Sequence, residues 1–448
     1  MNDIDQRSDS RTNGLWDSLP SALTRRRLLG AGAGAGLGWM LPACGGGGGA
    51  TGSTVIGGAG ASLASRTPMA STDPVMAEKV RALARASIET RFARAVLVRV
   101  TVDGKEIITE AFGESAAGVP ATTDMHFRNG AVAIALVAML LLRLVDEGKV
   151  ALDDKVATWL PKLPHGDRVT LRHLAQMTAG YADYVRDPDF VNAFLANPFR
   201  RWTPDELLAF AIHKPLLFEP GINWAYAHTN YVILGLALEK LTGRSVKDLM
   251  QDKVLGPLGM TQTSDPESAS IPEPVLRAFS SERREFLGVA AGTPFYEEST
   301  FWDPSWTITH GAVQVTDLYD LHTSAIAFGR GTILSPESHA AQVSTALRGK
   351  STPVEGCVTC LRQWEGYAFG LGVVTSGNWV LQPPMFGGYS AVAGYHEGSR
   401  LAIAVAVTYT PEAFNDAGDY KNGNEAENLF VRIATALLPD DLLPIARR

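Results

Sequence analysis

Cysteine and charge are both scarce in this chain of 448 residues. It has 3 cysteines, and 19% of its residues are charged against 46% that are hydrophobic. Three cysteines exclude a disulfide-rich scaffold and a four-cysteine zinc site, because each needs more thiols than the chain has. The net charge of −7 gives no basic footprint for nucleic acid. The composition therefore indicates a folded, core-rich protein with one large domain or several smaller ones.

The first 43 residues have the pattern of an export signal. A polar stretch leads into Thr24-Arg25-Arg26-Arg27-Leu28-Leu29, a Gly/Ala-rich apolar run follows, and the segment ends in Leu41-Pro42-Ala43-Cys44. This order is typical of a twin-arginine signal peptide closed by a lipoprotein cleavage box. The apolar run is shorter than the roughly 20 residues that a membrane-spanning helix needs. The alternative is a Gly/Ala tail on a cytosolic protein.

This pattern predicts removal of residues 1–43 and attachment of a lipid to Cys44. The mature protein would be a lipoprotein of the periplasm or cell envelope, anchored to a membrane through acyl chains. Residues 44–74 are rich in Gly, Ala, Ser and Thr, which predicts a flexible tether. We expect the folded body to begin near Asp73.

Two patterns define the first part of the body. Residues 93–112 form two apolar-alternating runs around Val102-Asp103-Gly104-Lys105, which predicts a β-hairpin. Residues 129–148 are apolar on every side in their first half. With Asn129 as the N-cap and Gly148 at the end, this pattern predicts a helix that is buried all round.

The middle of the body is a mixture of helical and loop signals. Thr203-Pro204-Asp205-Glu206 predicts a helix start, and residues 230–241 predict another helix that stops at Gly243. This part, residues 174–310, is expected to be an inserted, mostly helical domain. It would divide an α/β domain made of residues 75–173 and 311–448.

Strand patterns return in the last part of the chain. Residues 367–375 and 401–409 predict strands, and the second run is apolar enough for the centre of a sheet. Residues 424–438 predict a closing helix. The pattern as a whole indicates an α+β fold, an antiparallel sheet flanked by helices with the helical insertion described above.

Several short segments, in this order along the chain, carry a resemblance to a known family. They are Phe127-Arg128-Asn129-Gly130-Ala131-Val132-Ala133-Ile134, Leu144-Val145-Asp146-Glu147-Gly148-Lys149-Val150-Ala151-Leu152-Asp153-Asp154, Val169-Thr170-Leu171-Arg172-His173-Leu174, Phe218-Glu219-Pro220-Gly221, Tyr226-Ala227-His228-Thr229-Asn230-Tyr231, Val254-Leu255-Gly256-Pro257-Leu258-Gly259-Met260 and Phe386-Gly387-Gly388. From about residue 75 onwards the chain resembles the β-lactamase-related serine hydrolases, which include class C β-lactamases, D-alanyl-D-alanine carboxypeptidases and related esterases. The resemblance implies a β-lactamase/transpeptidase-like fold with the active site between its two domains, and it implies no cofactor and no metal.

All three catalytic motifs of that family depart from their expected form here. The nucleophile and base of Ser-x-x-Lys correspond to Ala131 and Ile134. Tyr-x-Asn appears as Tyr226-Ala227-His228, so the tyrosine remains and an imidazole replaces the amide. The Lys- or His-x-Gly motif appears as Phe386-Gly387-Gly388, without the cation that meets a substrate carboxylate. Another register that recruits Ser115, Thr122 or Thr123 would break the matches on both sides of the first motif.

The paired loss of serine and lysine is physically coherent. Removing only the serine would leave a buried ammonium without its partner, at a cost of several kcal/mol. Replacing both groups by apolar side chains can be nearly neutral. We therefore interpret Ala131 and Ile134 as the remains of a catalytic centre that no longer performs acyl transfer.

Backbone donors survive such changes, so the site is expected to retain some binding capacity. The N–H of Ala131 and one near Tyr389 or Ser390 are candidates for holding a carbonyl oxygen. Ala131, Phe386, Gly388 and Ser390 are the predicted ligand-binding positions. Ser390 is also open to two other readings, a relocated nucleophile and a structural serine on a strand.

Tyr226 and His228 are the candidate catalytic residues if chemistry persists. They are separated by one residue, and the imidazole would act as a base on the tyrosine or on water. The alternative is that His228 is an ordinary hydrogen-bonded histidine.

Cys357 and Cys360 lie in a loop-like stretch. After export we expect a local disulfide between them. A redox centre normally has a thioredoxin-like setting, which is absent from the sequence pattern, and zinc would need further ligands nearby.

The leading functional hypothesis is an exported, lipid-anchored and catalytically inactive relative of the serine hydrolases. It would bind a small acyl or peptide ligand, such as a peptidoglycan stem peptide, and no nucleic acid. The alternative is an active esterase, carboxypeptidase or β-lactamase-like hydrolase that uses substitute residues such as Tyr226 and His228. A third hypothesis is an envelope scaffold whose partner surface lies elsewhere.

Overall fold

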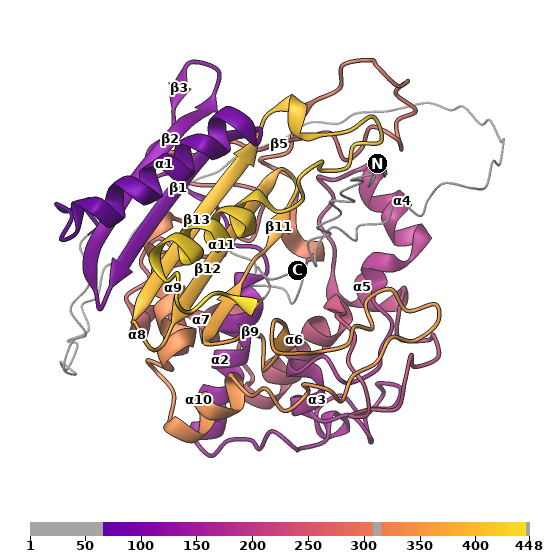
Figure 1. The fold of residues 1–448 in the computed structure, drawn as a ribbon. Coiled ribbons are helices and arrows are strands. Elements are labelled where there is room, and N and C mark those ends of the chain that lie inside the picture. Colours follow the sequence, from indigo (N-terminus) through magenta and orange to yellow (C-terminus); the bar gives the residue numbers. More distant parts are fainter. Residues whose placement is uncertain (1–65, 308–314, 445–448) are drawn as a thin grey trace, which may run out of the picture.

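The computed structural model describes residues 66–307 and 315–444 (Figure 1). The predicted signal peptide and lipidated Cys44 lie outside these residues, as does most of the predicted tether. The end of that tether already contacts the body, because the Arg66 guanidinium donates to Asp320 Oδ1 at 2.8 Å and the Thr72 N–H donates to the Glu106 carbonyl at 2.9 Å. The first helix begins at Pro74 with Asp73 as its N-cap, in agreement with a body that begins near Asp73.

The centre of the fold is a nine-stranded sheet in the order β3-β2-β1-β13-β12-β10-β9-β8, with β11 added to β12. Its paired strands are antiparallel. The strands are β1 (Ala93–Val102), β2 (Lys105–Ala116), β3 (Val119–Pro120), β8 (Ala368–Phe369), β9 (Val374–Ser376), β10 (Trp379–Gln382), β11 (Met385–Phe386), β12 (Tyr389–His396) and β13 (Leu401–Tyr409). The predicted hairpin is confirmed as β1 and β2, and Asp103 and Gly104 turn with φ of 49° and 75°.

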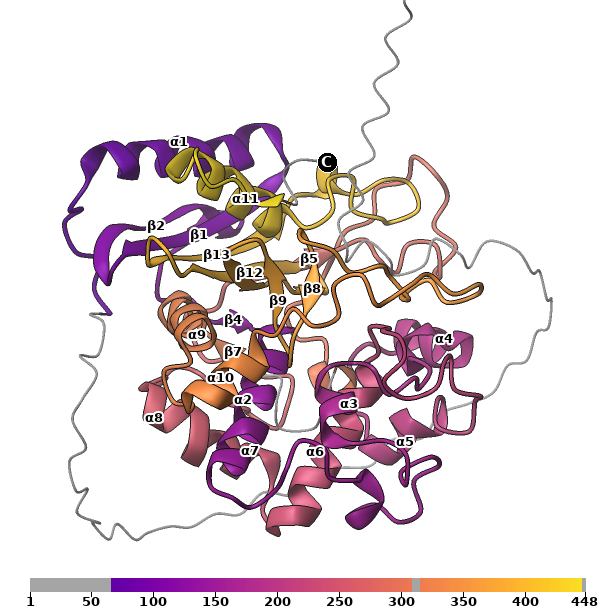
Figure 2. The same cartoon turned by 60° about the horizontal axis from the view of Figure 1, so that its bottom comes forward.

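Helices cover both faces of this sheet (Figures 1 and 2). On one face, α1 (Pro74–Thr90) packs beside α11 (Glu425–Leu437). On the other face lie α9 (Leu318–Arg330), α2 (Val132–Asp146) and α10 (Pro336–Gln342). Because each face is covered, β12 and β13 are buried along their whole length.

Helix α2 is buried as predicted, but it begins later than expected. Its N-cap is Ala131, whereas the sequence favoured Asn129. Gly130 adopts a positive φ of 51°, and the N–H groups of Val132 and Ala133 donate to Asn129 and Gly130 at 3.2 and 3.1 Å. A tight turn therefore precedes the helix and satisfies these donors without a side-chain cap.

The remaining elements lie mainly to one side of the sheet domain, where α3, α4, α5 and α6 gather (Figure 2). The helices are α3 (Leu171–Ala175), α4 (Pro188–Ala196), α5 (Pro204–Ala209), α6 (His228–Thr242), α7 (Val246–Met250) and α8 (Gly256–Leu258), with short helical turns η2 (Val156–Thr158), η3 (Tyr184–Arg186), η4 (Gln251–Leu255), η5 (Pro304–Trp306) and η6 (Pro411–Ala413). Two small sheets pair β4 (Phe127–Arg128) with β7 (Val315–Thr316) and β5 (Phe279–Ser280) with β6 (Glu297–Glu298). The exact domain boundaries given above stay a prediction.

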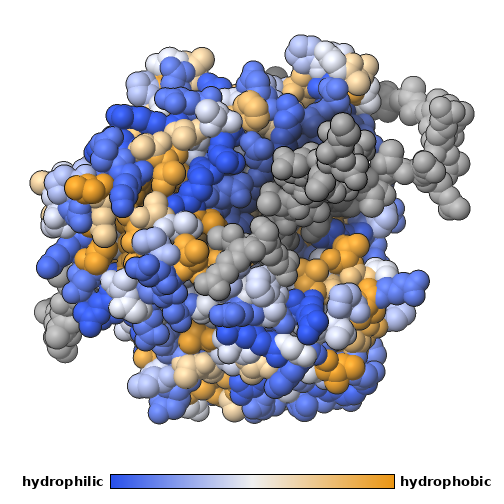
Figure 3. Space-filling model, viewed as in Figure 1, coloured by the Kyte–Doolittle hydropathy of each residue, from blue (hydrophilic) through white to orange (hydrophobic). Residues whose placement is uncertain are grey.

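Hydrophobic side chains are concentrated in the interior. On the face seen in Figure 3 they occur in several separate groups between hydrophilic residues. Within residues 66–307 and 315–444, no helix has both the length and the apolarity to cross a membrane.

Candidate functional site

The start of α2 carries the two residues that correspond to the family's nucleophile and base. Ala131 caps the helix and is partly exposed, whereas Ile134 is 0% exposed. Neither side chain offers a nucleophilic or basic atom. The first hydrogen bonds of the helix are donated by the N–H groups of Val132, Ala133 and Ile134. The Ala131 N–H precedes them and makes no hydrogen bond to any described residue. One backbone donor therefore remains at this position.

His228, at the start of α6, forms a polar pair with Asp183, which precedes η3. His228 Nδ1 lies 3.2 and 3.1 Å from the two carboxylate oxygens of Asp183, and the His228 backbone N–H donates to Asp183 Oδ1 at 3.1 Å. The Asp183 side chain is 4% exposed and that of His228 is 19% exposed. His228 Nε2 has no hydrogen-bond partner among the described residues. Asp183 thus fixes the orientation of the imidazole and leaves Nε2 for another group.

Tyr226 is buried beside this pair. Its ring meets the His228 ring edge-on, with centroids 5.2 Å apart. Burial, with a smaller contribution from the nearby Asp183 charge, raises the pKa of Tyr226 well above its ordinary value. The Tyr226 hydroxyl therefore stays protonated at neutral pH, so it is poorly suited to act as a base.

Phe386 stands where the family's cation would be. It is 5% exposed and stacks on Trp306, with centroids 5.8 Å apart and an interplanar angle of 23°. Trp306 in turn lies 6.2 Å from the His228 ring. The rings of Phe386, Trp306, His228 and Tyr226 therefore form a continuous row, which we call the aromatic row.

The aromatic row adjoins the start of α2. A Cβ placed on Gly130 would lie 2.6 Å from Cβ of Pro384, two residues before Phe386. This close approach places the turn that precedes Ala131 against the segment that carries Phe386. The structure therefore brings three separate parts of the chain together at one site.

Gly388 does not provide the predicted ligand contact. It follows Gly387 in a two-residue turn between β11 and β12, and its N–H donates to the Tyr420 hydroxyl at 2.9 Å. A Cβ on Gly388 would lie 2.4 Å from the Phe279 carbonyl oxygen. Tyr389 pairs with Phe386 across this turn, which engages its backbone in the hairpin. The expected second backbone donor is thus already used inside the protein.

Ser390 points away from the site. Its hydroxyl accepts hydrogen bonds from the Tyr409 hydroxyl at 2.7 Å and from the Ala426 N–H of α11 at 3.3 Å. Side chains alternate along a strand, so Ser390 lies on the face opposite Tyr389 and Phe386. Its prediction as a ligand-binding residue is wrong for the side chain, as is its reading as a relocated nucleophile.

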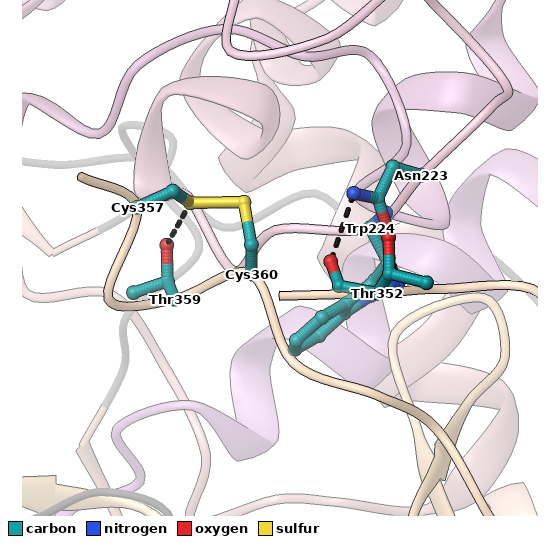
Figure 4. Close-up of a disulfide and its surroundings, with 6 residues drawn as sticks. All are labelled: Asn223, Trp224, Thr352, Cys357, Thr359 and Cys360. Atoms are coloured by element: carbon teal, nitrogen blue, oxygen red, sulfur yellow. Dashed lines mark hydrogen bonds between the residues drawn. A yellow bond between two sulfur atoms is a disulfide. The ribbon is translucent and has the colours of Figure 1, made fainter. Parts of the chain in front are cut away.

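The predicted disulfide between Cys357 and Cys360 is confirmed (Figure 4). Nearby, the Asn223 side chain exchanges hydrogen bonds with the Thr352 backbone, with both distances 3.0 Å. Trp224 follows Asn223 and precedes the Tyr226–His228 segment. The loop that carries the disulfide is therefore attached to the chain that leads into the site.

Sequence reasoning did not identify Asp183 and did not distinguish Trp306 from its neighbours. Asp183 lies 45 residues before His228, so no local pattern connects the two. Trp306 lies in a segment with several aromatic residues, Tyr296 to Trp306, and aromatic residues alone indicate packing and ligand contact equally well. In the described part of the chain, no group of three or more His, Cys, Asp or Glu side chains has a metal-binding arrangement.

Comparison with known proteins gives consistent matches. Residues 80–428 match the β-lactamase family. The chain is 28% identical to "Penicillin-binding protein 4" of Amycolatopsis lactamdurans over 337 residues, which cover 72% of this chain and 78% of that protein. It is 30% identical to "Penicillin-binding protein 4*" of Bacillus subtilis (strain 168) over 148 residues, covering 32% of this chain and 31% of that protein. With "Esterase EstB" of Burkholderia gladioli it shares 28% identity over 228 residues, or 45% and 58% of the two chains.

Solved structures show the same fold. The D-amino acid amidase of Ochrobactrum anthropi SV3 complexed with D-phenylalanine is similar with a TM-score of 0.66 and 20% identity, covering 81% of this chain and 99% of that one. A D-stereospecific amidohydrolase of Streptomyces sp. has a TM-score of 0.64 and 23% identity, covering 81% and 98%. These likenesses confirm the predicted α+β fold. The family match over residues 80–428 shows that this chain belongs to the β-lactamase-related serine hydrolase family.

Proposed function

We propose that this protein is an exported, lipid-anchored member of its family that binds a small acyl or peptide ligand without forming an acyl-enzyme. One observation carries the proposal. At the helix turn where a nucleophile and a base would stand, Ala131 has no reactive atom and Ile134 is a fully buried hydrocarbon.

Among the described residues, the surroundings offer no substitute nucleophile. None of the described Ser, Thr or Cys side chains hydrogen-bonds to the His228 ring, whose Nδ1 partner is Asp183. Ser390 lies on the opposite face of its strand. Covalent catalysis needs a nucleophile within hydrogen-bond reach of its base, so the geometry favours binding over acyl transfer.

Binding is supported by three features that do not need a nucleophile. The Ala131 N–H is a backbone donor without a partner among the described residues. The aromatic row offers apolar surface, and His228 Nε2 offers one polar contact beside it. Ligand sites commonly combine such an apolar lining with a few placed polar groups.

Activity and covalent labelling test this proposal. Purified mature protein is incubated with nitrocefin, p-nitrophenyl acetate and a fluorescent penicillin, and intact mass is then measured. We expect no covalent adduct and no turnover above that of His228→Ala protein. Turnover that exceeds this control, or an adduct on any residue of the site, would overturn the proposal.

The lipid anchor is tested separately. The sequence around Cys44 supports it, and Cys44→Ala is expected to move the exported protein from the membrane fraction to the soluble fraction. Unchanged membrane association would contradict this part of the proposal.

The Asp183–His228 pair favours a second candidate, a hydrolase that uses water directly. Water would attack the acyl carbon while Nε2 takes its proton and Asp183 stabilises the imidazolium, and the same proton would then pass to the leaving group. This candidate predicts ester hydrolysis that is lost in His228→Ala and reduced in Asp183→Asn. Tyr226→Phe would change the rate little, because the Tyr226 hydroxyl stays protonated.

A further inference from the structure

Two buried carboxylates at the start of α9 accept hydrogen bonds from one side chain of the N-terminal segment. Asp317 is the N-cap of α9, and Asp320 lies in its first turn. Their side chains are 3% and 2% exposed, and the Arg66 guanidinium donates to both of them. Arg66 belongs to the segment for which the sequence predicts a tether. A residue that precedes the first helix therefore occupies a site inside the body.

The body satisfies one oxygen of each carboxylate and leaves the other to Arg66. Asp317 Oδ1 accepts from the Asp320 N–H at 2.9 Å. Asp320 Oδ2 accepts from the Gln262 N–H and the Thr263 hydroxyl, both at 2.8 Å. The other two oxygens accept from the terminal nitrogens of the Arg66 guanidinium. Two buried carboxylates repel each other strongly unless a cation pairs with both, and Arg66 supplies that cation.

The geometry favours a guanidinium over an ammonium. Arg66 Nη1 and Nη2 donate to different carboxylates, which a planar group with several fixed donors can do at once. Arg66 Cζ also lies 5.3 Å from the ring centroid of Tyr319, and guanidinium groups interact well with aromatic rings. An ammonium is a compact point charge without this shape, so we expect lysine to be a poor substitute.

A second contact holds the segment between this site and α1. Thr72 donates from its N–H and from its hydroxyl to the Glu106 carbonyl, each at 2.9 Å. Glu106 lies in β2, and its carboxylate pairs with Arg99 of β1 at 3.3 Å. Residues 66–72 are therefore attached at one end to α9 and at the other end to the β1–β2 hairpin.

The sequence supplies one cation for this site. Between Cys44 and Lys79, Arg66 is the only lysine or arginine. A general attraction between a basic tail and an acidic surface therefore does not account for the contact. The attachment depends on a single side chain, and its removal would leave two buried charges without their partner.

We propose that the two carboxylates and Tyr319 form a guanidinium-binding site for Arg66, and that occupation of this site determines where the tether leaves the body. The exit point is then the start of α9 instead of the start of α1. The consequence for the membrane rests on the proposed lipid anchor at Cys44. With Arg66 bound, residues 45–65 join the anchor to the body. At full extension they span about 75 Å, whereas residues 45–73 would span about 100 Å.

Limited proteolysis tests whether Arg66 is bound. Trypsin cleaves after arginine only when the chain around it is released from the body. A synthetic peptide of residues 60–72 gives the cleavage rate for an unbound Arg66. We expect trypsin to cleave wild-type mature protein after Arg66 about tenfold or more slowly than the peptide, as measured by intact mass.

A double variant links this protection to the carboxylates. Asp317→Asn/Asp320→Asn keeps the cleavage site and removes the charges that hold it, so cleavage after Arg66 should approach the rate of the peptide. Asp189 and Asp205 are exposed acids in the first turns of α4 and α5. Asp189→Asn/Asp205→Asn is therefore the matched control and should retain the wild-type rate. Fast cleavage in this control would contradict the role of the α9 carboxylates.

Chemical rescue tests the class of ligand. Arg66→Ala leaves the two buried carboxylates without their cation and is expected to lower Tm by about 5 °C. About 20 mM guanidinium chloride should recover about a third or more of that loss, whereas the same concentration of ammonium chloride should recover little. Arg66→Lys is expected to lower Tm almost as much as Arg66→Ala. Equal recovery with both salts, or no recovery, would overturn the selectivity for guanidinium.

The outcomes separate this site from the function proposed above. If wild-type protein is cleaved after Arg66 as fast as the peptide, or as fast as the folded Asp317→Asn/Asp320→Asn protein, the inference is overturned. If Arg66 is protected but Cys44→Ala leaves membrane association unchanged, the lipid anchor fails and the guanidinium site stands. Should the double variant not fold, the comparison of wild-type protein with the peptide still decides the question.

Discussion

The two sides of the candidate site differ in kind. At the start of α2, the side chains of Ala131 and Ile134 are hydrocarbon and the helix is packed on every side. At the start of α6, His228 keeps a defined hydrogen-bond partner in Asp183 and one ring nitrogen without a partner among the described residues. One side has only hydrocarbon side chains at these two positions, whereas the other has an ordered polar pair.

This difference shows that an apolar helix start and an ordered polar pair can occur within one site. A buried lysine without a partner would be costly, so the α2 side is expected to be stable when base and nucleophile are both present or both absent, and unstable when only the base remains. The α6 side has no such penalty, because its buried carboxylate is satisfied by three hydrogen bonds, from His228 Nδ1, the His228 N–H and the Val185 N–H. The following predictions test whether the α2 side excludes charge and whether the α6 side depends on the hydrogen bonds of Asp183.

The largest effect is expected from Ile134→Lys. Its ammonium would be buried without a counter-charge, which should lower the free energy of unfolding by about 4–5 kcal/mol. Ile134→Met is the matched control and should cost less than about 1.5 kcal/mol. Urea denaturation measures both. Equal stability of the two variants would show that the α2 side admits charge, and the contrast between the two sides would then fail.

His322 lies on α9, which packs against α2. The pH dependence of stability at His322 tests whether this part of the interior also excludes a charged side chain. His322 of α9 accepts or donates a hydrogen bond with the Thr101 hydroxyl at 3.0 Å, and burial, with the nearby Arg99 charge, lowers its pKa to about 3. In the unfolded chain its pKa is about 6.5. Below that value the unfolded state binds a proton that the native state does not, so native stability falls as the pH falls from about 6.5 towards 3.

The slope of that fall is expected to be about 1.4 kcal/mol per pH unit. His322→Asn should remove this part of the pH dependence between pH 6 and 4, measured by denaturation at several pH values. His213 is exposed, so His213→Asn is the control and should leave the wild-type slope in place. A slope unchanged in His322→Asn would show that this layer tolerates a charged imidazole.

A smaller effect is expected on the α6 side. Asp183→Ala removes the acceptor for two backbone N–H groups and for the His228 ring, which should lower the free energy of unfolding by about 2 kcal/mol. Asp183→Asn retains one oxygen and should cost about half as much. The Asp183→Asn protein should also show a changed His228 tautomer in nitrogen-15 NMR. An unchanged tautomer would mean that Asp183 does not orient the ring.

Elements with strong local signals could be predicted from the sequence. The Asp103-Gly104 turn, the apolar run of β13 and the closing helix α11 all lie where the pattern placed them. In contrast, α1 was missed although Asp73 and Pro74 form a regular helix start. The Asn129 cap was displaced because the turn at Gly130 satisfies the same backbone donors.

The site was harder to predict because its contacts are tertiary. The Asp183–His228 pair depends on how α6 packs against the turn at Tyr184, which no local periodicity encodes. Ser390 was placed on the wrong face because β12 is buried on both faces, and a strand without alternating polarity gives no indication of which residues point where. The absent nucleophile and base, by comparison, needed only the sequence.

The glycine turn that follows Phe386 limits which residues position 387 can hold. A Cβ on Gly387 would lie 2.9 Å from the Trp302 ring, and φ at Gly387 is 44°. Any larger residue there must displace a buried indole and adopt a backbone conformation that it disfavours. Position 387 is therefore held as glycine by the packing of Trp302, whichever residue stands at position 386, so exchanges at the neighbouring position 386 are free of this constraint only while residue 387 stays glycine.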